Sequence, residues 1–406
     1  MTVSTQTKGR LDYLDAARAL ALLLGIVFHA SLSFLPMFIG WAVMDISTSN
    51  VVSIFVLISH SFRMELFFLI AGFFSHMAIQ KNGLHAFLAT RGIRIVIPFI
   101  IGWFLLRPML VSGWVIGAES MRGEADVSDG LIQGIMSLKD LPNGLFVGTH
   151  LWFLYYLIII TAIILILRSL ISISPSVKHK VTALINKVIA WICYSPIALC
   201  IVVVPIAVSL WFMSHWGMDT PDKSLIPNFP VLFIYLGFFS LGWLINKQEG
   251  LMEVYAKLTW PKIVLCFVAV VLTVMLSSFQ GQTGHPQHEL LHVCFTLTYA
   301  LTMWLLTSLF IGLCCRVFRE VRGFMRYLAS ASYWLYLIHL PVVIWLQIAF
   351  SEIELHWFLK LISICTLTIA FSLVLYELFV RSTIIGTVLN GRKKLHMLAK
   401  KPSVTS

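Results

Sequence analysis

The sequence has few charged residues. Only 12% of its 406 residues are charged and 59% are hydrophobic, whereas an ordinary soluble domain carries about 25% charged residues. A mean hydropathy of +0.90 describes the same imbalance. The shortage of charge therefore excludes an ordinary soluble domain and indicates a protein that crosses the membrane many times.

Cysteine is missing from the positions where it would form disulfides or bind metal. The seven cysteines fall in apolar stretches or at their predicted cytoplasmic ends, and no CxxC pair is present. The sequence therefore excludes a disulfide framework and a cysteine metal site, and the thiols are expected to be buried apolar groups. We expect no metal and no permanently bound cofactor.

Long polar segments are also rare, because apolar stretches occupy most of the chain. A spanning helix needs about 20 mostly apolar residues. The stretches that meet this requirement are 14–37, 51–79, 92–113, 150–171, 189–213, 229–246, 260–279, 291–313, 328–350 and 357–380. The first exceeds the ~7–15 apolar residues of a secretory signal and others follow it, so we interpret it as a retained helix. The predicted fold class is all-α, a polytopic transmembrane helical bundle of about ten spans.

Positive charge is unevenly distributed along the chain. The net charge of +11 could indicate a nucleic-acid partner, but most of the 29 lysines and arginines fall on one side of the membrane. This positive-inside pattern places both termini in the cytoplasm. We therefore predict a lipid bilayer environment and no nucleic acid, with a cytoplasmic segment 1–12, a membrane domain 13–385 and a basic cytoplasmic tail 386–406.

The longest predicted external loop covers residues 114–149 and is mildly acidic. A structureless loop of this length is uncommon unless it is functional or disordered. We therefore expect short helices in it, and it is the best candidate for a lid that faces the substrate.

Several ionisable residues fall inside the predicted spans, where charge is costly and usually faces a bundle interior or an aqueous cavity. At the rise of an α-helix, His29, Arg63 and His339 lie ~18–20 Å from a membrane surface and His60 lies ~14 Å from one. These groups therefore reach similar depths in the middle of the membrane. A lone histidine can instead only bridge two helices by hydrogen bonds. Glu65 points about 200° away from Arg63 and is expected to be a structural partner.

Arginines mark the cytoplasmic edge of the same region. Arg18 and His29 are eleven residues apart, which places them on one stripe of a helix, ~16 Å apart. Arg91 and Arg94 share a face at the start of the third span. They fit ordinary positive-inside anchoring, but together with Arg18 they could also form a cluster suited to phosphate groups. A coenzyme A thioester bound there could reach a histidine in mid-membrane through its pantetheine arm.

Four motifs occur in order along the chain. They are Arg18 and His29 separated by ten residues, "FFLIAGFF" over 67–74, Arg91 and Arg94 followed by Pro98, and Tyr336-x-x-His339-x-Pro341. Together they resemble the acyltransferase-3 family of integral membrane O-acyltransferases, and the likeness covers nearly the whole chain. Ala71 stands where this family usually has serine, so the chain lacks that hydroxyl.

Three further motifs resemble one branch of this family, whose members succinylate osmoregulated periplasmic glucans. "HSFRM" contains His60 and Arg63, "HLWFL" begins at His150 and includes Trp152, and "LYEL" includes Glu377. The resemblance implies a multi-pass enzyme of the bacterial inner membrane that moves an acyl group from cytoplasmic acyl-CoA to a periplasmic sugar hydroxyl. The implied donor is succinyl-CoA, with acetyl-CoA as the alternative, and the implied acceptor is a periplasmic glucan or another glycan. His150, Trp152 and Glu377 are expected to be structural or acceptor-side residues.

The resemblance also gives the buried groups expected roles. The residues expected to bind the donor are Arg18, Arg91, Arg94 and Tyr336. The catalytic residues are expected to be His29, His60, Arg63 and His339. A neutral imidazole at His29 can take the proton of the attacking hydroxyl, or it can accept the acyl group first as a nucleophile; we prefer the base. The other three would orient the acyl carbonyl, or the carboxylate of a succinyl group, which suits a planar guanidinium.

Two other classes of function use the same features differently. A proton-coupled secondary transporter could relay protons through the buried histidines, but such proteins usually contain internal repeats and paired broken helices, and the sequence shows neither. A structural or sensory membrane scaffold would not need aligned buried arginine and histidine. The enzyme is therefore the preferred interpretation.

Overall fold

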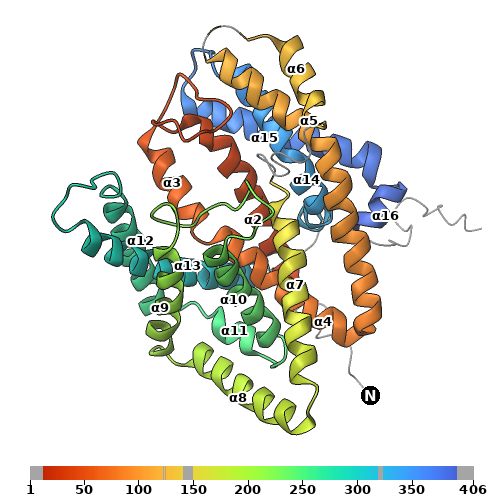
Figure 1. Ribbon diagram of the computed structural model, residues 1–406, viewed down its shortest axis with the longest axis vertical. Helices are drawn as coiled ribbons and strands as arrows, with labels where there is room; N and C mark the ends of the chain where they lie inside the picture. The colour runs from red at the N-terminus through yellow and green to blue at the C-terminus, as the bar shows by residue number, and fades with distance from the viewer. Residues whose placement is uncertain (1–11, 122, 124, 140–149, 319–322, 391–406) are drawn as a thin grey trace, which may run out of the picture.

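The computed structural model describes residues 12–121, 123, 125–139, 150–318 and 323–390. Parts of the predicted segments 1–12 and 386–406, and part of the loop 114–149, lie outside these residues. The described elements are all helical (Figure 1). The α-helices are α2 Asp12–Ser31, α3 Asn50–His60, α4 Arg63–Arg91, α5 Ile97–Ser120, α6 Val127–Met136, α7 Trp152–Ile171, α8 Pro175–Tyr194, α9 Ala198–Trp211, α10 Phe229–Ile245, α11 Leu251–Tyr255, α12 Trp260–Ser277, α13 His288–Val317, α14 Phe324–Phe350, α15 Trp357–Leu375 and α16 Ile384–Asn390. Short helices of other types are η1 Leu32–Phe34, η2 Gly92–Val96 and η3 Tyr376–Val380.

Many of these helices are suited to a membrane. Seven helical segments of the described chain are long and apolar enough to cross it, or eight if the bent pair α8 and α9 forms one span. The run Asn50–Ser120 counts as one segment although the chain reverses within it, and α10 is slightly shorter than the others. Each predicted stretch overlaps a helix. The all-α, multi-pass prediction is therefore confirmed, while the number of spans and the side of each terminus stay predictions.

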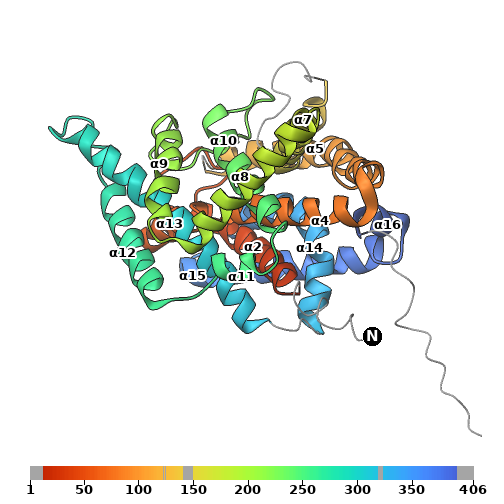
Figure 2. The ribbon, with the colours of Figure 1, turned by 90° about the horizontal axis from the view of Figure 1, so that it is seen from below.

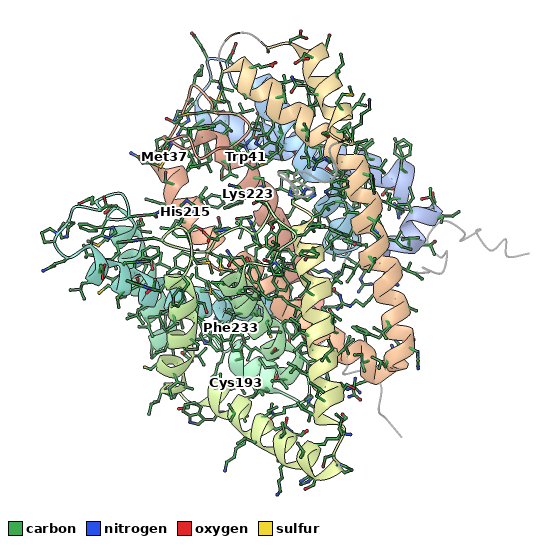
Figure 3. The ribbon with its side chains drawn as sticks, viewed as in Figure 1. Met37, Trp41, Cys193, His215, Lys223 and Phe233 are labelled. Carbon is green, nitrogen blue, oxygen red and sulfur yellow. The ribbon has the colours of Figure 1, made fainter. Side chains whose placement is uncertain are left out.

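The fifth predicted stretch, 189–213, is not straight. It contains the end of α8 and the whole of α9, and these two helices meet at 102°. Figure 1 shows α8 lying across one end of the molecule, between the ends of α7 and α9. Figure 3 marks Cys193 at that end, whereas Trp41, His215 and Lys223 lie in the half of the molecule farther from α8.

Helix α2 lies at the centre of the bundle (Figure 2). It packs against α4, α13, α14 and α15. Its buried residues include alanines at 16, 17, 19 and 21, each with no exposed surface. Small side chains let helix backbones approach closely in a membrane, where packing rather than the hydrophobic effect drives association. The first predicted span is therefore the scaffold around which the other helices assemble.

The second predicted stretch, 51–79, is interrupted where it carries its polar residues. We expected one helix over this stretch, but α3 ends at His60 and α4 begins at Arg63. Phe62, between them, has φ −140° and ψ −19°, outside the helical region. Non-helical backbone at membrane depth is tolerated where it is buried in protein or lines a cavity. Both side chains do line a cavity.

A second irregularity separates α4 from α5. Gly83 adopts φ +79° and breaks the helical course of α4, and such a positive φ is accessible mainly to glycine. The chain then forms the wide turn η2, and Pro98 lies in the first turn of α5, where its missing N–H costs nothing. Arg91 ends α4 and Arg94 lies within η2, so this reversal carries two of the three arginines that were predicted to bind the donor.

The predicted loop 114–149 is partly helical. Helix α5 continues to Ser120, and the short helix α6 follows. The Asp126 side chain accepts hydrogen bonds from the backbone N–H groups of Ser128 and Asp129, which is the usual N-cap of such a helix. The expectation of short helices in this loop is therefore confirmed. Residues 140–149 lie outside the described chain.

Candidate functional site

A cavity of about 530 Å³ lies between α2, α4, α7 and α14. Every predicted site residue except Glu377 lines it. The predicted residues on its wall are Arg18, His29, His60, Arg63, Arg91, Arg94, His150, Trp152, Tyr336 and His339. Helices α2, α3, α4, α7 and α14, the turn η2 and His150, two residues before α7, supply these side chains. Segments far apart in the sequence therefore meet at one cavity.

Glu377 lies elsewhere. Its two carboxylate oxygens each accept a hydrogen bond of 2.8 Å from Nη1 of Arg381. The Glu377 side chain is 40% exposed and does not line the cavity. Glu377 and Arg381 thus form an ion pair within one helical turn. Because Glu377 lies outside the cavity, it has no role in the chemistry proposed below.

One end of the cavity is rich in arginine. The Nη2 atom of Arg18 lies 3.1 Å from Oδ1 of Asp15 and 3.5 Å from the carbonyl oxygen of Ala329. Arg91 donates a hydrogen bond to the Ser75 hydroxyl. The backbone of Arg94 is held by the Tyr333 hydroxyl, which donates to its carbonyl at 2.5 Å. Arginine prefers phosphate and carboxylate ligands, which its planar guanidinium binds with paired hydrogen bonds.

The cavity as a whole is positively charged. Four arginines line it, and no described aspartate or glutamate is among the lining residues. Asp15 offsets part of the charge of Arg18 from outside the lining. A buried charge is costly unless it is paired, so the unbalanced guanidinium groups favour an anionic ligand.

The other end of the cavity is rich in histidine. The ring centroids of His29 and His339 are 5.3 Å apart, and those of His339 and His150 are 5.2 Å apart. The ring of Phe28 stacks on His60 at 5.4 Å and lies 4.1 Å from the guanidinium carbon of Arg63. Depth counted along separate helices predicted the meeting of His29, His60, Arg63 and His339. His150 was expected on the acceptor side or in a structural role.

Backbone carbonyls fix the protons on three of the four histidines. Nε2 of His60 lies 2.8 Å from the Met218 carbonyl oxygen, and Nε2 of His150 lies 2.9 Å from that of Leu337. Nδ1 of His339 lies 2.9 Å from the Tyr336 carbonyl oxygen. Because a carbonyl only accepts, each of these nitrogens carries the proton. In a neutral ring the remaining nitrogen then has a free lone pair.

His29 differs from the other three. No hydrogen-bond partner for its Nδ1 occurs within the described part of the chain, and the ring is part of the cavity wall. No backbone carbonyl therefore assigns its tautomer. His29 is consequently the histidine of this group on which no backbone carbonyl imposes a tautomer, whereas His60, His150 and His339 each have one ring nitrogen bound to a carbonyl and one free.

Arg63 is buried but incompletely paired. It is 5% exposed, and its Nη1 atom has no hydrogen-bond partner among the described residues. Glu65, two positions later, is fully buried and does not line the cavity. A buried guanidinium with an unpaired donor, in a residue that lines a cavity, is suited to a carboxylate on the bound molecule.

Tyr336 connects the two ends of the cavity. Its hydroxyl donates to the carbonyl of His150 at 2.9 Å, and its ring stacks on Tyr333 at 6.3 Å. Trp152 also lines the wall, and its ring stacks on Tyr235 at 5.8 Å. Tyr336 thus holds the segment that carries His150 against α14.

Sequence reasoning missed the loop that contacts the histidine end. No described residue of the predicted lid 114–149 lines the cavity, whereas Thr220 of the loop 212–228 does. The neighbouring Met218 contributes the carbonyl that binds His60, and its N–H lies 3.4 Å from the hydroxyl of Tyr299. Every residue type has a backbone carbonyl that can accept a hydrogen bond. The amino-acid sequence therefore carried no signal for this contact.

Sequence reasoning also missed Trp41 and Gln347, which contact His29. The Trp41 ring stacks on the imidazole, and the Gln347 amide binds the backbone carbonyl of His29. A glutamine inside an apolar span was the one available signal, because polar groups there usually have a partner.

Comparison with known proteins gives a consistent result. The family described as "Acyltransferase domain" matches residues 11–377. The protein called "Glucans biosynthesis protein C" from Escherichia coli (strain K12) is 26% identical over 387 residues, which is 94% of each chain. The protein of the same name from Escherichia coli O1:K1 / APEC is 27% identical over 389 residues, again 94% of each chain. No solved structure matches the chain.

Proposed function

This chain belongs to the acyltransferase domain family and is a multi-pass membrane acyltransferase, and from that premise we propose that it transfers a succinyl group from cytoplasmic succinyl-CoA to a hydroxyl group of a periplasmic glucan. Acetyl-CoA is the alternative donor. The acceptor is proposed because relatives that match over 94% of the chain carry the name "Glucans biosynthesis protein C". The bacterial inner membrane is the proposed location, because it separates such a donor from such an acceptor.

The observation that carries the proposal is the distribution of charge and imidazole in one cavity. Arginines lie at one end and the proton-exchanging His29 lies towards the other. Arg18 and His29 are ~16 Å apart along α2 by helical rise. A donor whose phosphates bind the arginines can extend its pantetheine arm along this distance and present its thioester to His29.

The reaction needs one proton acceptor. The sugar oxygen attacks the thioester carbonyl carbon while Nε2 of neutral His29, the ring nitrogen other than the buried Nδ1, takes the hydroxyl proton. The carbon–sulfur bond then breaks, and the leaving thiolate takes the proton from the imidazolium. The products are a sugar ester and free coenzyme A. A route through an acyl-histidine is the alternative, and the general-base route needs fewer steps.

The other groups of the histidine end would orient the acyl group. His339 presents a nitrogen lone pair when neutral, because its Nδ1 proton is bound to backbone carbonyls. Arg63 has a free donor in a cavity without lining carboxylates. That donor supports a succinyl group over an acetyl group, since only the succinyl group carries a free carboxylate for a guanidinium to bind.

The test is a transfer assay with the full chain in lipid nanodiscs. Purified protein is given radiolabelled succinyl-CoA or acetyl-CoA and a purified neutral glucan, and ester formation is followed by mass spectrometry. We expect succinyl ester on the glucan and a higher kcat/KM with succinyl-CoA. Arg63→Ala should remove most of that preference. Wild-type protein that forms no ester with either donor contradicts the proposal, and equal use of both donors contradicts the role of Arg63.

A further inference from the structure

Gln347 of α14 joins the end of α2 to the loop 35–49. Its Nε2 donates to the carbonyl oxygens of His29 and Ala30, each at 3.0 Å, and lies 3.1 Å from Oγ of Ser33. Its Oε1 accepts a hydrogen bond of 2.9 Å from the indole nitrogen of Trp41. An indole only donates and a backbone carbonyl only accepts, so these partners fix the orientation of the amide. Gln347 is 1% exposed and replaces water at the last turn of α2, where carbonyls have no helical partner.

Trp41 covers one face of the His29 imidazole. The two ring centroids are 5.8 Å apart and the planes differ by 17°. Trp114 packs edge-on against Trp41, with centroids 5.2 Å apart. His29 lines the cavity and Trp41 does not, so the indole lies behind the imidazole when it is seen from the cavity.

A buried ion pair anchors the loop that carries Trp41, which Figure 3 labels. Nζ of Lys360 lies 2.7 Å from Oδ1 of Asp45, and the two side chains are 0% and 2% exposed. The N–H of Asp45 donates to the carbonyl of Ser33 at 2.8 Å. Lys360 also donates to the carbonyl of Ser351 at 3.3 Å. The loop 35–49 is thus fixed to α15 and to the end of α2, and the position of the indole is fixed with it.

We propose that Trp41 and Gln347 are positioning residues for His29. Gln347 holds the backbone of the turn that carries His29, and Trp41 holds the plane of its ring, so that one edge of the imidazole faces the cavity. Packing must orient the imidazole ring, because Nδ1 of His29 has no hydrogen-bond partner in the described chain. The arrangement leaves Nε2 free for proton exchange while the ring stays oriented.

This inference rests on the proposed function, in which His29 is the general base. A base acts only within about 2.6–3.2 Å of the proton it takes, and a displacement of about 1 Å can cost on the order of 100-fold in rate. Donor binding at the arginine end does not depend on the ring plane of His29. A positioning role therefore predicts a loss in kcat without a change in the KM for the donor.

The experiment compares substitutions of Trp41 that remove or keep the aromatic face. Trp41→Leu and Trp41→Met remove it, and Met has a similar volume to Leu but a flexible side chain that adapts to an irregular space, in case the Leu variant fails to fold. Trp41→Phe keeps an aromatic face but loses the indole N–H. We expect kcat to fall about 10- to 100-fold in the first two, the KM for succinyl-CoA to stay within about twofold, and Trp41→Phe to recover most of the rate. Gln347→Leu should lower kcat in the same way.

Trp345→Leu is the matched control. Trp345 lies on α14 near Gln347 and its indole donates to the Met109 carbonyl at 3.3 Å, but it does not contact His29. This variant should keep the wild-type kcat. Wild-type kcat in folded Trp41→Leu or Trp41→Met overturns the proposal. A loss that Trp41→Phe fails to recover, or one matched by a rise in the KM for the donor, also overturns it.

The same assays separate this inference from the proposed function. An inactive wild-type protein contradicts the function itself, and an active His29→Gln variant contradicts the general-base role of His29. An active wild type, an inactive His29→Gln and an active Trp41→Leu contradict only the positioning role.

Discussion

At the scale of single residues, His29 is the group on which the proposed chemistry depends. Glutamine at this position keeps a hydrogen-bonding side chain but cannot take a proton near neutral pH. We expect His29→Gln to lower turnover by about 10²–10⁴-fold, the usual contribution of a general base, while acyl-CoA binding is retained. Turnover and donor binding are measured on folded protein in nanodiscs.

The control for this variant is His179→Gln, because His179 is an exposed histidine on α8. It should behave as wild type. Near wild-type turnover in His29→Gln would instead assign His29 a structural role, since the loss of an interhelical hydrogen bond in a membrane costs only about 1–2 kcal/mol.

Arg18 is the residue with which the donor-binding proposal is tested. It lines the arginine end of the cavity and its side chain is 39% exposed, so it can reach a bound phosphate. Arg18→Ala should chiefly raise the KM for acyl-CoA. Arg18→Lys should recover part of the affinity, because an ammonium group keeps the charge but lacks the planar fork.

Steady-state kinetics with varied acyl-CoA measure this effect. Arg168→Ala provides the comparison, because Arg168 is an exposed arginine at the end of α7 that does not line the cavity. An unchanged donor KM in the alanine variants of Arg18, Arg91 and Arg94 would rule out the donor-binding assignment.

At the scale of helices, the close packing of α4 on α10 depends on glycine. A methyl group added at Gly72 would meet the backbone carbonyl of Phe239, and one added at Gly242 would meet that of Leu69. A backbone carbonyl cannot move aside as the end of a side chain can. We expect Gly72→Ala to lower the free energy of unfolding by about 1–3 kcal/mol, the usual cost of overpacking, as measured by thermal unfolding in detergent.

Gly237 on the same helix pair supplies the control. Nothing lies within 4 Å of a methyl group added there, and alanine is favoured over glycine inside a helix by about 0.5–1 kcal/mol. Gly237→Ala should therefore leave the Tm unchanged or raise it. A Gly72→Ala variant as stable as Gly237→Ala would show that the two helices can separate without cost.

At the scale of the whole molecule, the charge distribution predicts that both termini lie in the cytoplasm. Lysine and arginine outnumber acidic residues 29 to 18, and their bias to one side of the membrane sets orientation. Reporter fusions near Asp126 and near the C-terminus should report opposite sides. If both report the same side, the even number of spans and the cytoplasmic route of the donor are wrong.

Much of the fold was predictable because it is a local property of the chain. A long apolar stretch must form a helix in a membrane, since its backbone groups have no other partners there, and each predicted stretch does overlap a helix. The common stripe of Arg18 and His29 follows from helical periodicity within α2 alone. The interruption between His60 and Arg63 was not predictable, because it contains neither proline nor glycine.

The sequence by itself determined the membrane class, the helices and the residue types that the cavity contains. Only the tertiary structure decided that His150 lies beside His339, that a backbone carbonyl of the loop 212–228 binds His60, and that Trp41 and Gln347 hold His29. The physical reason is the range of the interactions. Helical periodicity and apolar length act between near neighbours in the chain, whereas these contacts join segments that become neighbours only when the helices pack.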